Sequence, residues 1–336
     1  MTVAVSPRLA TPGARWLDAE QRERVRQWQR SWWWRWSLPT WGVIALIYGG
    51  WAVTVHYWRV LPAWFAWPLL IGLTAWHLSL QHELIHGHPT RWPWINHLLG
   101  IAPLAVFYPF AVYRDSHLQH HLDEMLTWPG ADPESYYVAQ SDWGRLPSWR
   151  RRLIAVRQTS LGRLLIGPAC SVAAMLAAQP AWLARRGGAG VTAWALHVAL
   201  LLLMLKQLSL QGLAPGVYLL GVAYPALSLT MVRSLLEHRH ADAVPARSVL
   251  NEAAWPWRLL FLNLNYHLVH HDLPGVPWFG LARVYFDRRA DYRRRNQDFC
   301  LTGYGDLLWR HVRRPVLDAR HPEAEHAAAM IMCDFK

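Results

Sequence analysis

The sequence predicts an all-α integral membrane protein with about four transmembrane helices and a cytoplasmic helical cap. Of its 336 residues, 53% are hydrophobic and only 17% are charged, whereas a soluble domain carries about 25% charged residues. Long apolar runs follow one another along the chain, at 41–58, 62–80, 161–183, 191–205 and 213–231. Basic segments flank these runs, as is typical of cytoplasmic ends of membrane helices.

The two ends of the chain are basic. Residues 1–40 contain "RERVRQWQRSWWWRW", which predicts a cytoplasmic interfacial segment whose tryptophans lie at the depth of the lipid headgroups. We expect a membrane domain at 41–285 and an Arg-rich cytoplasmic tail at 286–336. The net charge of +12 is concentrated beside apolar runs, so we do not expect nucleic acid as a partner.

The first two apolar runs predict a helical hairpin. At about 1.5 Å per residue each run can cross a hydrocarbon core of about 30 Å, and only a few residues join them. Pro103 and Pro109 interrupt the next apolar stretch, so we expect it not to span. Pro168 and Pro180 mark the run at 161–183 as a second exception. Four spans then remain, with both termini in the cytoplasm.

Eighteen histidines are the unusual feature of the composition. Three clusters share helical spacings of i, i+3 and i+4, which place side chains on one face of a helix. Their members are His82 and His86; His117, His120 and His121; and His267, His270 and His271. The stretch "EHRH" adds His238 or His240 as a ninth candidate, and the spacing does not decide between them.

This number of imidazoles predicts two metals. One zinc ion takes four donors, whereas eight or nine nitrogens suit two ions with four or five ligands each. Glu83 completes an H-E-x-x-H pattern, in which a zinc peptidase would use it as a base. We interpret Glu83 and Glu237 instead as acceptors that orient metal-bound rings. Four other acids beside the clusters have the same potential role: Asp115, Asp123, Glu124 and Asp272.

Other stretches have structural interpretations. "ADPESYY" predicts the start of a helix, with Asp132 as the cap and Pro133 in the first position. "DLPGVPW" predicts a turn directly after the third histidine cluster. The histidines of the tail, His311, His321 and His326, are expected to be solvated.

The clusters "HELIHGHP", "HLQHH" and "NYHLVHHDLPGVPW" resemble, in this order, the three histidine boxes of integral-membrane fatty-acid desaturases. The resemblance implies a centre of two non-haem irons, with O2 as co-substrate. It carries the ligand role to the eight clustered histidines, and His238 resembles the additional histidine after the fourth span. His240, its neighbour, remains an alternative.

The resemblance also implies the reaction and the partners. We expect a fatty-acyl desaturase that forms a C=C bond in an acyl lipid, acyl-CoA or acyl-carrier substrate. A separate ferredoxin- or rubredoxin-type protein would supply electrons. The alternative with the same metals is a hydroxylase or ketolase of an alkane, carotenoid or acyl lipid. An intramembrane zinc peptidase built on His82, Glu83 and His86 ranks lower, because it leaves the other two clusters unexplained.

Overall fold

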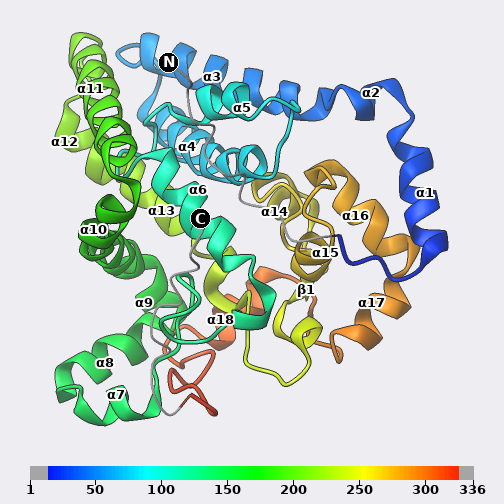
Figure 1. The fold of residues 1–336 in the computed structure, drawn as a ribbon. Helices are drawn as coiled ribbons and strands as arrows, with labels where there is room; N and C mark the ends of the chain where they lie inside the picture. The colour runs from blue at the N-terminus through cyan, green and yellow to red at the C-terminus, as the bar shows by residue number, and fades with distance from the viewer. Residues whose placement is uncertain (1–13, 325–336) are drawn as a thin grey trace.

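The computed structural model describes residues 14–324 and is mostly helical, with loops between the helices (Figure 1). In this part of the chain, the strands are limited to β1 (Leu250–Asn251) and β2 (Cys300–Leu301), which pair in parallel. The prediction of an all-α protein is therefore confirmed.

Four helical segments are long and apolar enough to cross a membrane, as predicted. They are α3 (Leu38–His56), α4 (Ala63–Ile85), α11 (Gly188–Leu210) and the composite segment Pro215–Leu236. The last consists of α12 (Pro215–Tyr218), a π-helical turn η2 (Leu219–Ala223), α13 (Tyr224–Thr230) and η3 (Arg233–Leu236). The chain is a multi-pass membrane protein.

The two apolar runs predicted not to span differ from these segments. The stretch with the two prolines forms α5 (Pro93–Gly100) and α6 (Phe110–His120), with irregular backbone at 101–109. The run at 161–183 is divided between α9 (Ser160–Leu165) and α10 (Gly167–Arg186), and α10 is not among the candidate spans. Pro168 occupies the beginning of α10, where a missing N–H costs nothing.

The turns of the two membrane hairpins meet each other. The Arg59 guanidinium donates to the carbonyl of Gln211 over 3.1 Å, so the link between α3 and α4 touches the link between α11 and α12. His82 lies near the other end of α4. At the end of α4 that lies by these turns, a Cβ on Gly221 of η2 would lie 2.0 Å from the Trp67 ring. Only glycine permits this close approach of the two spans.

The remaining helices of the described chain are short. Before the second hairpin these are η1 (Asp123–Met125), α7 (Gln140–Arg145) and α8 (Ser148–Arg157). After the fourth span they are η4 (Val244–Arg247), α14 (Trp255–Leu260), α15 (His267–Asp272), α16 (Trp278–Asp287), α17 (Arg289–Arg295) and α18 (Tyr304–Arg310).

The N-terminal helices α1 (Ala19–Gln29) and α2 (Trp32–Arg35) pack on α16 and α17. Arg24 pairs with Asp287 at 2.7 Å, and Trp34 is buried against the ring of Phe279. By contrast, Trp32 is 67% exposed. The aromatic segment thus divides its tryptophans between the protein core and the surface.

The last described residues are hydrogen-bonded to the loop after η1. The Val138 N–H donates to Ala319, the His321 N–H donates to Val138, and the Gln140 N–H donates to Ala324, over 2.7–2.9 Å. The His321 ring is fully buried in this contact, so the prediction of a solvated side chain was wrong for this residue. His326 lies outside the described residues.

Candidate metal centre

Nine histidines from four parts of the chain form two groups that can each hold a metal ion. In each group, one nitrogen from every ring lies within 4.8 Å of the others. The first group consists of His82, His86, His117, His121 and His270. The second consists of His120, His238, His267 and His271.

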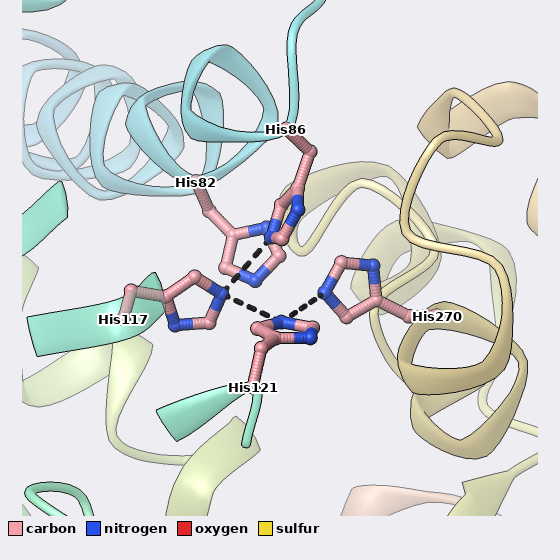
Figure 2. A group of neighbouring side chains, drawn as sticks. All are labelled: His82, His86, His117, His121 and His270. Atoms are coloured by element: carbon pink, nitrogen blue, oxygen red, sulfur yellow. Dashed lines mark hydrogen bonds between the residues drawn. The ribbon is translucent and has the colours of Figure 1, made fainter. Parts of the chain in front are cut away.

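Three helices supply the first group (Figure 2). His82 lies in the last turn of α4 and His86 is its C-cap; His117 and the C-cap His121 come from α6, and His270 comes from α15. The five rings surround a common point. Consecutive Nε2 atoms of His86, His117, His121 and His270 are each 3.1 Å apart.

The second group lies beside the first. His120 comes from α6, His267 and His271 come from α15, and His238 follows the fourth span. The His238 Nε2 lies 3.1 Å from that of His120 and 2.9 Å from that of His267. The His121 and His271 rings stack across the boundary, with centroids 4.3 Å apart.

The structure places His238, and not His240, in the second group. The His240 Nε2 instead lies 3.4 Å from Glu323, and its ring contacts His321. Two residues along an irregular stretch are enough to turn one ring toward the group and the other toward the C-terminal segment.

Burial keeps most of these rings neutral. Loss of solvation, reinforced by neighbouring histidines, lowers the pKa well below its usual value for five rings: His86, His121, His238, His267 and His270. A neutral imidazole keeps the lone pair that a metal requires. At neutral pH the rings are therefore ready ligands.

Hydrogen bonds among the rings leave several buried ring nitrogens without a partner. Both nitrogens of His82 are buried without a hydrogen-bond partner, as is the Nδ1 of His86, and such buried polar atoms are costly. Imidazole donors favour iron, zinc, copper or nickel. The residues present therefore fit two metal ions, one with up to five nitrogen ligands and one with up to four.

Acidic side chains orient two of the rings through hydrogen bonds to their Nδ1 atoms. The His117 Nδ1 donates to Glu134 over 3.0 Å, and the His120 Nδ1 donates to Asp132 over 2.9 Å. Burial alone would lower the pKa of His120, but the charges of Asp132 and Glu134 outweigh it and raise this pKa to about 10. The two carboxylates thus create a negative potential that favours a bound cation.

The role of Asp132 and Glu134 was not predicted, and the predicted helix start at "ADPESYY" was wrong. Residues 131–134 form turns and a bend, and the next helix, α7, begins at Gln140. The Asp132 carboxylate accepts the N–H groups of Thr127 and Glu134 as well as the His120 ring, which holds the segment as a loop. The sequence signal that could have predicted this role is the pair of acidic residues, Asp132 and Glu134, that follows the second histidine cluster.

Glu237 lies where an orienting acid was predicted. Its carboxylate is 3.0 Å from the His267 Nδ1, although not aligned for a hydrogen bond, and it pairs with Arg233.

Other predicted acids have different contacts. Asp115 binds Arg186 and Trp182, Glu124 pairs with Arg15, and Asp272 pairs with Arg295. The Asp123 side chain lies outside the described part of the structure.

Glu83 does not contact a histidine in the hydrogen bonds of the described residues. Its carboxylate is buried and accepts the backbone N–H of Trp278 over 3.2 Å. The side chain therefore points from α4 toward the first residue of α16, and the expected ring-orienting contact is not formed.

A model of the fatty acid desaturase family matches residues 61–299, which is more than two thirds of the chain. The matched region contains all nine histidines of the two groups. No curated protein matches the chain.

Proposed function

The chain belongs to the fatty acid desaturase family, and from this premise we propose that it is an O2-dependent fatty-acyl desaturase with a di-iron centre. The family makes it an oxidoreductase of the membrane. The observation that supports the reaction most directly is the pair of buried histidine groups at the ends of the membrane spans. We further propose a bacterial inner-membrane location, with this centre on the cytoplasmic side.

The five-histidine group would hold one iron and the four-histidine group the other. When bound, two irons supply the capacity to reduce O2 and to remove hydrogen from unactivated methylenes. Two adjacent methylenes, O2, two electrons and two protons would then give a C=C bond and two water molecules. We assign the electrons to a separate ferredoxin- or rubredoxin-type protein.

The residues of the chain prepare this centre. Carboxylates at the Nδ1 atoms of His117 and His120 fix the tautomer that leaves each Nε2 free as a ligand. Burial of the rings excludes water, which protects a reactive oxidant from side reactions. Exposed leucines on α11, such as Leu202 and Leu203, face the lipid from which an acyl substrate would come.

Lipid analysis tests the reaction. We expect expression in a host of defined lipid composition to produce acyl chains that are two hydrogens lighter, detected by mass spectrometry. A gain of one oxygen would instead establish the hydroxylase or ketolase alternative. One zinc per chain and activity that survives His270→Ala would establish the peptidase. The purified protein should contain about two irons per chain, as the two groups require.

A further inference from the structure

Glu83 lies between two metal-binding histidines of α4, yet its carboxylate is directed away from both metal groups. It accepts the Trp278 N–H with both oxygens, at 3.2 and 3.3 Å. Trp278 is the first residue of α16, whose own N-cap is Pro277 and provides no side-chain cap. The first N–H groups of a helix lack partners within the helix and need an acceptor from outside it. Glu83 is thus the cap of a helix 195 residues away in sequence.

The Trp278 peptide is held from both sides. Its carbonyl accepts the side-chain amide of Asn263 over 3.0 Å, while Glu83 holds its N–H. Asn263 precedes α15 and has a positive φ of 54°, a conformation that favours asparagine or glycine.

These contacts join two of the three helices that supply the five-histidine group. His82 and His86 lie on α4, whereas His270 lies on α15, which leads through the turn at 273–277 into α16. Apolar packing of Leu80, Leu84 and Leu262 surrounds the junction, but apolar contacts alone allow small sliding movements. The directional hydrogen bond that the Trp278 N–H donates to the buried Glu83 side chain fixes the position of α16, and with it the position of α15.

We propose that Glu83 is a positioning residue that sets the separation of α4 and α15, and thereby shapes the five-histidine group. It is neither a metal ligand nor the base of a peptidase. This inference rests on the proposed function insofar as that group holds one of two irons. The four-histidine group contains no residue of α4, so the separation of α4 and α15 enters the geometry of the five-histidine group alone.

The test compares Glu83→Gln with Glu83→Leu in the full-length protein. Glutamine keeps an oxygen that accepts the Trp278 N–H, and leucine has none. We expect Glu83→Leu to release one of its two irons to a chelator about ten-fold faster than wild type, in the range of changes to supporting contacts of metal sites. The Mössbauer spectrum should change for that iron alone. Glu83→Gln should restore both properties.

A matched control separates positioning from general loss of stability. Gln81, also buried on α4, donates to the Gly100 carbonyl over 2.7 Å and connects α4 to α5 instead of α16. Gln81→Leu should lower thermal stability without selective release of one iron. If Glu83→Leu does not fold, Asn263→Gly is the second variant. It removes the side-chain amide that donates to the Trp278 carbonyl and should give the same selective release of one iron.

The inference is overturned if Glu83→Leu retains both irons like wild type, or if Glu83→Gln keeps both irons but loses turnover as a catalytic base would. Wild type that binds no iron would overturn the proposed function instead. Hydrogen exchange of the Trp278 amide then still tests the clamp: exchange should accelerate in Glu83→Leu and not in Gln81→Leu, and equal rates would refute it.

Discussion

In each H-x-x-H-H motif, the histidines at positions i and i+4 belong to one metal group, and the histidine at position i+3 belongs to the other. His117 and His121 join the first group and His120 the second; His267 and His271 join the second and His270 the first. Positions i+3 and i+4 of a helix differ by about 100° around its axis. One helical turn can therefore serve two ions, and α6 and α15 each contribute to both groups.

Single substitutions should separate the two groups. We expect His86→Ala and His238→Ala each to lower bound iron from about two to about one per chain, and to reduce turnover at least about 100-fold. His240→Ala, two residues from His238, should keep both irons, because its ring lies beside Glu323. Iron analysis of the purified variants checks this, and loss of iron in His240→Ala would contradict the assignment.

The acids behind the rings should tune the affinity for metal. Asp132→Asn removes the charge beside His120, and we expect an affinity for iron about 10–100-fold lower. Competition with a chelator of known affinity measures the change. Asp115→Asn is the control, because Asp115 contacts Arg186 and Trp182 rather than a metal-binding ring. Equal effects of the two variants would argue against an orienting role for Asp132.

His321 should make stability depend on pH. Burial, with the nearby charges of His240 and Arg247, lowers its pKa to about 4, whereas an unfolded histidine titrates near 6.5. Below about pH 6.5 the unfolded chain binds a proton that the folded chain does not, so the free energy of unfolding falls as pH falls. By about pH 5 the loss from this group should reach about 2 kcal/mol.

The variant His321→Asn isolates this effect. An asparagine oxygen can still accept the Ala324 N–H that the His321 Nδ1 accepts over 2.9 Å, but it does not titrate. Between about pH 7.5 and pH 5, wild type should lose more stability than the variant, measured by denaturant unfolding in detergent. Identical pH dependence of the two proteins would refute the prediction.

Sequence spacing was enough to identify the clustered histidines but not their partners. The ligands repeat at helical intervals, so their shared faces follow from one helix at a time. Asp132 and Glu134 reach the rings from an irregular loop, and Glu83 reaches a peptide 195 residues away. Such contacts depend on the packing of several elements, which periodicity does not encode.

At the scale of elements, hydropathy predicted the spans because each is long and apolar. It did not predict the π-helical turn η2 within the fourth span, since the sequence there is as apolar as its neighbours. The turn brings Gly221 against Trp67. A π-helical turn of this kind commonly marks a place with a structural or functional demand.

Gly221→Ala should destabilise the contact between the second and fourth spans. The added Cβ would overlap the Trp67 ring, and overpacking typically costs about 1–3 kcal/mol. Gly216→Ala is a matched control, because a Cβ there meets no atom within 4 Å. Thermal unfolding in detergent should show a lower midpoint for the first variant only, and equal midpoints would mean that Trp67 moves aside freely.

At the scale of the whole molecule, the metal groups join parts of the chain that are far apart in sequence. Their ligands come from α4, α6, α15 and the stretch after the fourth span. Binding of a metal to the folded state alone stabilises it in proportion to affinity.

Removal of the metal should therefore loosen the elements that carry the ligands. We expect chelation of iron to lower the unfolding midpoint by more than 5 °C, which corresponds to about 3 kcal/mol or more for a chain of this length. Hydrogen exchange should increase in α6 and α15 more than in α11, whose residues are absent from both groups. Unchanged exchange in α6 and α15 after complete iron removal would contradict this picture.

The contact between residues 319–324 and the loop at 138–140 has a practical consequence for protein engineering. That loop begins just after the two carboxylates that hold His117 and His120. Truncation of the chain at about residue 316, or insertion of an affinity tag there, would remove the backbone contact that steadies those carboxylates. A distal deletion, far from any histidine box in sequence, would thus weaken the oxidising centre itself.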